Sequence, residues 1–228
     1  MTDDIIYIDK PAGMTSFGVV ARIRRVLSQR AGHKVKVGHT GTLDPFATGL
    51  MILVVGAACK RADHYSKLDK VYEATWTLGQ TSSTGDPEGE LTVRSDRQPT
   101  REEIDRVIQN FTGLIEQRPP IFSAIKIDGQ RAYKLARDGQ EIEMPLRSVT
   151  VYSLEVLSYE YPQLIVRAHV SSGTYIRSLA VDVGEALDTG AYCSRLRRTA
   201  IAEWSVDEAA QLRDFGIDDD NKGGIKDE

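Results

Sequence analysis

The stretch with the clearest potential for chemistry is the loop from Gly38 to Gly49, which contains three glycines, one histidine and one carboxylate. Glycine allows positive φ and the close approach of another chain, so this density of glycine predicts a shaped loop against which a ligand docks. Asp44 is the only acid in the loop. Asp followed by Pro also commonly opens a helix as its cap. A carboxylate fixed there is equally a positioned nucleophile or base.

Several other chemistries lack the residue pattern that they require. The loop never presents the Gly-Lys pair of a G-x-x-x-x-G-K-[ST] phosphate loop, and no G-x-G-x-x-G follows a strand-like run. The four histidines show no paired spacing with cysteine or aspartate, so we expect no metal site. Cys59 and Cys193 are too few for a disulfide framework and are typical of core thiols in a reducing compartment.

Two tyrosines and an arginine complete the candidate set. Tyr72 lies on the apolar face of an alternating run, so it is either core or a ring that faces a pocket. Tyr175 and Arg177 stand near the start of an expected helix. An aspartate that meets an arginine stays ionised, which suits a nucleophile or base. Together with Asp44, these side chains predict action on a planar, electrophilic substrate without a cofactor.

The charge distribution separates the body of the chain from its end. The formal net charge is −4, and the residues from Asp214 onward carry all of it, so the body is neutral overall. Six basic residues and no acid occur from Arg22 to Lys36, just before the glycine loop. Such a run is often only a solvated helix face, but beside a docking loop it predicts a track for phosphate groups.

The elements expected to hold these residues mix strands and helices without strict alternation. Strands are expected at residues 5–8, 51–55, 71–78, 122–127, 149–156, 164–170 and 200–204, and helices at 16–27, 57–68, 100–111, 132–137 and 172–187. This pattern predicts an α+β domain on a large mixed sheet over residues 1–213, followed by a disordered acidic tail at 214–228. No stretch reads as a signal peptide or membrane span, so we expect a cytoplasmic protein.

Seven short motifs occur in a fixed order along the chain. They are KPAGMTS at 10–16, KVGHTGTLDP at 36–45 with ATG at 47–49, KVYEA at 70–74, TGDPEG at 84–89, PPIFSAIK at 119–126, GTYIR at 173–177 and LRR at 196–198. In this order they resemble the TruB family, the bacterial tRNA pseudouridine-55 synthases. The resemblance implies the pseudouridine synthase fold, a large and mostly antiparallel sheet with flanking helices and a catalytic cleft, and neither a cofactor nor a metal.

The resemblance also implies roles for individual residues. Asp44 matches the catalytic aspartate. Tyr72 matches the tyrosine that stacks on the target base and has been assigned a proton-abstracting role. Arg177 matches the arginine that pairs with the aspartate, and Tyr175 matches a pocket tyrosine.

Further matches concern contacts with RNA. His39 matches the histidine that enters the T loop of tRNA. Lys60, Asp86 and Leu196 match other pocket or RNA-facing positions. Residues 119–147 match the flexible thumb segment that closes over RNA.

The implied substrate is free tRNA, bound through its T stem-loop, with no obligatory protein partner and no membrane. A guide-dependent branch that modifies rRNA shares the glycine-loop motif, and a noncatalytic tRNA-folding chaperone would use the same surface, so both remain alternatives. Val170 and Ser172 stand where many members have Cys and Lys. The chain ends soon after Leu212, so we expect no C-terminal RNA-binding PUA domain, and RNA affinity would come from the catalytic domain alone.

Overall fold

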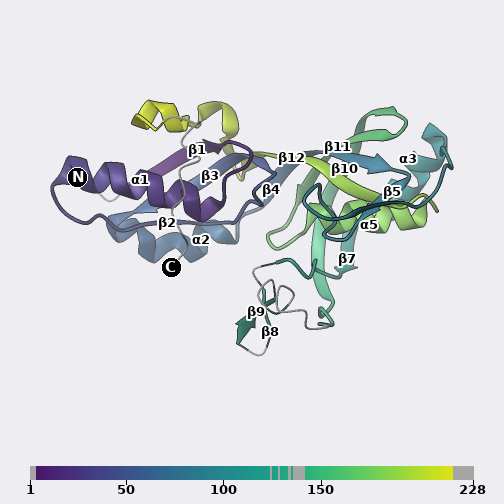
Figure 1. Cartoon of the computed structure of the whole chain (residues 1–228), viewed down its shortest axis with the longest axis horizontal. Coiled ribbons are helices and arrows are strands. Elements are labelled where there is room, and N and C mark those ends of the chain that lie inside the picture. The colour runs from purple at the N-terminus through teal and green to yellow at the C-terminus, as the bar shows by residue number, and fades with distance from the viewer. Residues whose placement is uncertain (1–3, 124, 128, 133–134, 136–141, 218–228) are drawn as a thin grey trace. The chain divides into compact units, whose positions relative to one another are not determined.

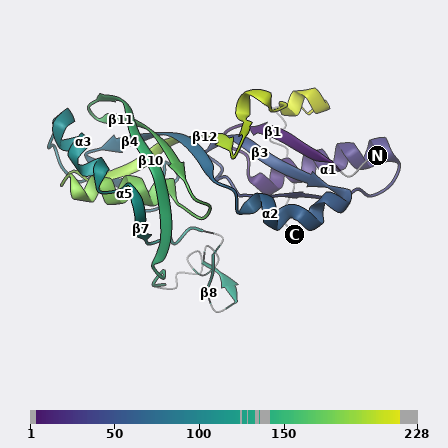
Figure 2. The same ribbon diagram turned by 180° about the vertical axis from the view of Figure 1, so that it is seen from behind.

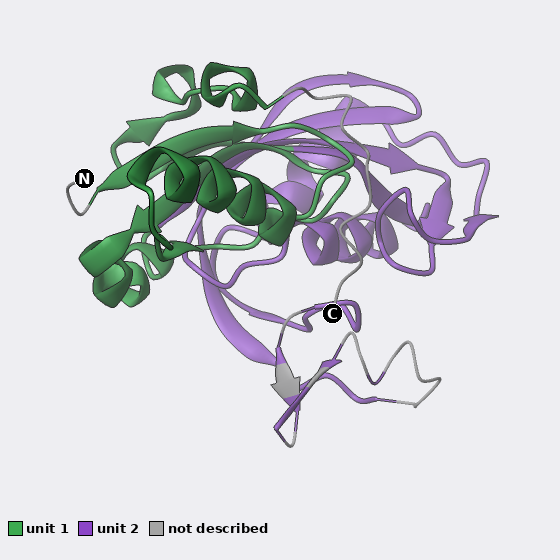
Figure 3. Cartoon of the chain, turned by 60° about the vertical axis from the view of Figure 1, so that its left-hand side comes forward, with its two compact units in different colours: residues 1–68, 197–228 green, residues 69–196 purple. Residues whose placement is uncertain are grey.

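The computed structural model describes residues 4–123, 125–127, 129–132, 135 and 142–217. The chain divides into two compact units (Figure 3). Unit 1 combines Met1–Leu68 with Arg197–Glu228, and unit 2 is Asp69–Leu196. The sequence shows no linker at either boundary, so this division is a finding of the structure.

Unit 1 is built around β3 (Thr48–Val55). β1 (Ile5–Lys10) pairs antiparallel with β3 over most of its length, and β2 (Val37–His39) pairs antiparallel with its last residues. The end of β12 (Ala191–Ile201) pairs parallel with the start of β3. Since the catalytic-loop candidate joins β2 to β3, both ends of that loop are held by one sheet (Figure 1).

The helix α1 (Ser16–Ala31) shows why the spacing of apolar residues predicts a helix. Its buried face consists of Ser16, Val19, Val20, Ile23 and Leu27, at the three- and four-residue spacing of one helix face. The hydroxyl oxygen of Thr15 accepts a hydrogen bond from the Gly18 nitrogen at 2.9 Å, so Thr15 is the N-cap. Gly32, with a φ of 72°, ends the helix. Ser16 is also a residue type that caps helices, but here it is the first helical residue.

Unit 2 carries a sheet in the order β12, β4, β11, β10, β7, in which β4, β11, β10 and β7 pair antiparallel. These strands are β4 (Lys70–Leu78), β7 (Gly113–Gln117), β10 (Arg147–Glu160) and β11 (Gln163–Val170). The helices α3 (Arg101–Gln109) and α5 (Ile176–Ala186) contact each other, and they pack on β10 and β4 respectively (Figure 2). They therefore cover the same face of the sheet.

The remaining elements are short. Two hairpins pair β5 (Gln80–Ser82) with β6 (Leu91–Val93) and β8 (Lys126–Ile127) with β9 (Gln130–Arg131). The other segments are the 3-10 helix η1 (Gly56–Arg61), α2 (Ala62–Ser66), β13 (Trp204–Ser205), η2 (Val206–Glu208) and η3 (Leu212–Phe215).

The predicted fold class is confirmed, since helices flank a large mixed sheet whose pairings are mainly antiparallel. Some local predictions are wrong. The strand β7 was not predicted. The last long strand begins at Ala191 instead of residue 200, and α5 begins at Ile176 instead of 172. The strand expected at 122–127 is confined to Lys126–Ile127 among the described residues.

Two further predictions concern segments that the structure describes only in part. Most of the helix expected at 132–137 lies outside the described residues. The expected tail begins at 214, yet residues 214–217 belong to the folded body. Ile217 is buried, and its nitrogen donates to the Leu212 carbonyl at 3.2 Å.

Two searches of the described residues give negative results. None of the described helices has the length and apolar character to cross a membrane. In the same part of the chain, no three His, Cys, Asp or Glu side chains are grouped so that they could hold a metal ion.

Candidate active site

Asp44 lies on a tight turn in unit 1. The Ala47 nitrogen donates to the Asp44 carbonyl at 3.1 Å, which closes a four-residue turn with Pro45 as its second residue, where proline is favoured. The strand β3 follows directly. Asp44 is therefore not the cap of a helix, and the residue is half-buried.

Side chains from β1 and α1 anchor this turn through its main chain. The Ser16 hydroxyl donates to the Leu43 carbonyl at 2.9 Å and accepts from the Leu43 nitrogen at 2.8 Å. The fully buried Lys10 ammonium donates to the Pro45 carbonyl at 3.2 Å, as well as to two nearer carbonyls. The residues before and after Asp44 are thus both fixed, which pre-organises the carboxylate.

The other unit 1 candidates flank the loop in sequence. His39 ends β2 and is half-buried, whereas Lys60 lies in η1 and is exposed. The Gly56 nitrogen donates to the Lys36 carbonyl at 2.9 Å, so η1 begins beside the end of the basic run. Lys60 therefore adds a cation near Lys36.

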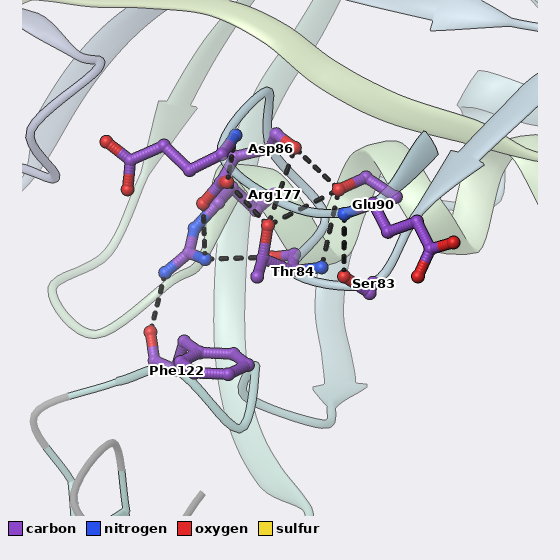
Figure 4. A network of polar contacts seen from close by, with 8 residues as sticks. Ser83, Thr84, Asp86, Glu90, Phe122 and Arg177 are labelled. Atoms are coloured by element: carbon purple, nitrogen blue, oxygen red, sulfur yellow. Dashed lines mark hydrogen bonds and ion pairs between the residues drawn. The ribbon is translucent and has the colours of Figure 1, made fainter. Parts of the chain in front are cut away.

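Arg177 is the centre of a buried polar network in unit 2 (Figure 4). It is the second residue of α5 and is 4% exposed. Its Nη1 donates to the Asp86 Oδ2 at 2.8 Å and to the Thr84 carbonyl at 2.9 Å. Its Nη2 donates to the Phe122 carbonyl at 2.9 Å. Two segments that are distant from α5 in sequence therefore fix one guanidinium.

Asp86 completes this network from the β5–β6 turn. Its Oδ1 accepts from the Thr84 hydroxyl at 2.6 Å and from the Glu88 nitrogen at 3.0 Å, while Oδ2 accepts from Arg177. We expected Asp86 at a pocket or RNA-facing position. The carboxylate is buried and accepts hydrogen bonds from these donors, among them Arg177, and the expected pocket or RNA-facing role stays a prediction.

Three more candidates of unit 2 lie on its sheet and on α5. Tyr72 of β4 is 9% exposed and lies opposite Ala168 of β11. Leu196 of β12 is buried as well. Tyr175 precedes α5, and the buried Gln117 amide binds both its nitrogen, at 2.7 Å, and its carbonyl, at 3.0 Å.

Sequence reasoning missed Gln117 as a support of the site. Gln117 ends the strand β7, which was not predicted. The one indication of a role in the sequence was the position of Gln117 just before the Arg-Pro-Pro stretch. Because its amide offers both a donor and an acceptor, it can bind the main-chain nitrogen and the carbonyl of one residue at the same time.

Unit 2 also contains a cavity of about 720 Å³. Its walls come from the β5–β6 turn, residues 118–122, residues 142–144 and α5, and they include the half-buried Asp182. Burial, and secondarily the nearby Glu185 carboxylate, raises the pKa of Asp182 to about 6. This carboxylate therefore takes up its proton at a higher pH than an ordinary aspartate does.

The candidates are divided between the units. Unit 1 carries His39, Asp44 and Lys60, and unit 2 carries Tyr72, Asp86, Tyr175, Arg177 and Leu196. Within unit 2 the structure brings Arg177 and Asp86 into an ion pair. The expected pairing of Arg177 with Asp44 joins different units and stays a prediction.

Comparison with known proteins places the chain in an enzyme class. Residues 24–176 match the sequence model described as "TruB family pseudouridylate synthase (N terminal domain)". The protein is thus a pseudouridine synthase by class. It belongs to the TruB family.

Individual relatives agree with this assignment. The chain is 42% identical to the tRNA pseudouridine synthase B of Phocaeicola vulgatus over 93% of its own length and 91% of that protein. It is 44% identical to the protein of that name from Parabacteroides distasonis, over 90% and 88% of the two chains. Among solved structures, it resembles a chain of a Cbf5-Nop10-Gar1 complex, with a TM-score of 0.71 and 33% identity. The match covers 92% of this chain and about half, 52%, of that chain.

Proposed function

We propose that the protein converts uridine 55 in the T loop of tRNA to pseudouridine. The observation that carries this proposal is the similarity, at 42–44% identity over about nine-tenths of the chain, to proteins named tRNA pseudouridine synthase B. The position in the T loop rests on the resemblance of the loop around Asp44 to the motif of the tRNA pseudouridine-55 synthases.

The first physical requirement of this reaction is access to the base. A uridine within a folded loop cannot be attacked in place, so it must be flipped out of its stack. In our proposal the Tyr72 ring stacks on the flipped base, while His39 enters the T loop. Tyr175 and Leu196 line the pocket, and Lys60 contacts the RNA. A stacking surface of this kind lowers the cost of unstacking.

The second requirement is a group that starts the rearrangement. The bond between the ribose and the base nitrogen breaks, the base turns, and a bond to a ring carbon forms, so product and substrate have the same atoms. We assign Asp44 to this step, either as the nucleophile or as a base that helps to remove a proton. Its turn is fixed on both sides by Ser16 and Lys10, which supports a role that depends on position.

Arg177 is proposed to keep Asp44 ionised. A guanidinium stays charged at any physiological pH, and an opposite charge within a few ångströms favours the ionised carboxylate. The network around Arg177 supports this role, because Asp86 and two carbonyls hold the guanidinium in one orientation. Asp86 thereby acts on the reaction only through Arg177.

A guide-dependent activity on rRNA is the second candidate. The structural similarity to chains of complexes titled Cbf5-Nop10-Gar1 and "H/ACA RNP bound to a substrate RNA containing 2'-deoxyuridine" favours it. Those chains are 33% and 29% identical, below the identity of the tRNA-named relatives. We therefore prefer the tRNA activity without a protein partner.

The deciding experiment incubates the purified protein alone with an unmodified tRNA transcript and maps pseudouridine by position. Conversion at position 55 without added RNA or protein is expected. Conversion only after a guide RNA and partner proteins are added would support the second candidate. Binding and refolding of tRNA without any pseudouridine would indicate a chaperone. The Asp44→Asn variant controls for contaminating activity.

A further inference from the structure

Arg198 is a buried cation that joins the two ends of the loop carrying Asp44. It lies in β12, belongs to unit 1 and is 1% exposed. Its Nε donates to the Leu50 carbonyl at 2.7 Å, and its Nη2 donates to the Gly41 carbonyl at 3.1 Å. Gly41 precedes Asp44 by three residues, and Leu50 follows it by six. One guanidinium therefore binds both ends of the loop.

Two glycines of the loop lie against Arg198, Gly49 against its main chain and Gly41 against its guanidinium. At Gly49, where φ is 111°, an added Cβ would lie 2.2 Å from the Arg198 carbonyl oxygen, so only glycine fits. At Gly41, an added Cβ would lie 3.5 Å from the Arg198 Nη1, which is ordinary van der Waals contact. Two of the three glycines that first drew attention to the loop thus lie directly against one residue.

The partners of Arg198 differ from those of its neighbour. Arg197 binds both carboxylate oxygens of Asp9, at 3.0 and 2.8 Å. Within the described part of the chain, Arg198 makes no ion pair, and its hydrogen bonds go only to main-chain carbonyls. A buried cation is costly without a carboxylate. The planar guanidinium of arginine donates from separate nitrogens in a fixed geometry, whereas a lysine donates from a single point.

We propose that Arg198 is a positioning residue for catalysis, which acts by holding both ends of the Gly41–Leu50 loop so that Asp44 keeps its reactive orientation. This inference rests on the proposed role of Asp44. Displacement of a reacting group by about 1 Å can cost about 10²-fold in rate. Loss of the two hydrogen bonds from Arg198 should therefore slow the chemical step without removing any group that contacts RNA.

The test compares Arg198→Lys and Arg198→Met with a destabilised control, Ile23→Ala. Ile23 is fully buried in α1 of the same unit. Its side chain is apolar, so it takes no part in the hydrogen bonds described above that hold the loop. Single-turnover rates and tRNA affinities are measured on each protein well below its melting temperature. For Arg198→Met we expect a fall of about 10²-fold in the single-turnover rate with unchanged affinity. Arg198→Lys keeps the charge but not the planar guanidinium, so its single-turnover rate should lie between those of Arg198→Met and the wild type.

Ile23→Ala should lose thermal stability while the folded protein turns over at the wild-type rate. If the Arg198 variants behave in the same way, the residue is merely structural and the inference is wrong. If Arg198→Met fails to fold, Arg198→Lys alone decides between these outcomes. Inactive wild-type protein, or an active Asp44→Asn variant, would instead refute the proposed function, so the two failures are distinguishable.

Discussion

Removal of the Asp86 carboxylate should destabilise the protein far more than removal of an exposed ion pair. Asp86 and Arg177 side chains are 5% and 4% exposed, and their charged atoms lie 2.8 Å apart. Asp86→Ala leaves the guanidinium buried without this partner, for which a loss of about 3–5 kcal/mol is typical. With roughly 2–4 °C per kcal/mol for a chain of this size, the melting temperature should fall by about 6–20 °C.

The matched control is the ion pair of Glu73 and Arg167, in the same unit. Its charged atoms are 2.7 Å apart, but the side chains are 39% and 47% exposed. Solvent screens such a pair, so Glu73→Ala should cost only about 0–1 kcal/mol. Equal losses for the two alanine variants would contradict the importance that we give to burial.

A double-mutant cycle separates the pair from its surroundings. Asp86→Ala, Arg177→Met and the double variant are unfolded thermally and with denaturant. The double variant should be more stable than the sum of the single losses predicts, by about 0.5–3 kcal/mol, because it no longer buries a lone charge. Additive losses would refute the reasoning. Loss of pseudouridine formation in folded Asp86→Ala would further indicate that Asp86 acts through Arg177.

Other predictions address the substrate site, the RNA surface and a titrating group. Asp44→Asn should abolish turnover but keep folding and tRNA binding, measured by melting and affinity. Tyr72→Phe keeps the ring, so binding should persist while turnover falls by roughly 10²–10⁴ if the hydroxyl transfers protons. Replacing Arg24 and Arg25 by Glu should weaken tRNA binding. The slope of log K against log salt concentration should become less steep by roughly 0.7–0.9 for each phosphate contact that is lost. The pKa of Asp182 is raised to about 6, so between roughly pH 4 and 6 the folded state binds more protons than the unfolded state. The free energy of unfolding therefore falls as the pH rises through this range. Asp182→Asn should therefore raise the melting temperature at pH 7.5 by roughly 2–4 °C, after allowance for solvent screening, and by less near pH 4.

The parts of the fold that the sequence predicted well depend on local patterns. The helix expected at 100–111 corresponds to α3, which begins with a capping box between Thr100 and Glu103. The apolar spacing in α1 identifies its buried face, and the strands expected at 149–156 and 164–170 lie within β10 and β11. In each case, neighbours within a few residues decide the structure.

The wrong predictions arise where distant contacts override a local preference. Asp44 and Pro45 form a favourable helix start, but Leu43 and Pro45 are tied to Ser16 and Lys10, and a strand follows immediately. Similarly, β7 is short and only partly buried, and it becomes a strand through its pairing with β10. A run of five residues is too short for an alternation of apolar and polar residues to identify such a strand.

The same distinction separates the candidate residues that could be named from the contacts that could not. Asp44 could be proposed as a site residue because its glycine-rich surroundings are contiguous in sequence. Asp86 lies 91 residues from Arg177, and Arg198 lies 157 residues from Gly41. Nothing in the local sequence indicates that these charges are buried together or what they hold. Since a buried charge must find its partners in the folded chain, its role becomes visible only when the contacts are known. Side chains that support a site are therefore harder to predict from one sequence than the side chains that react.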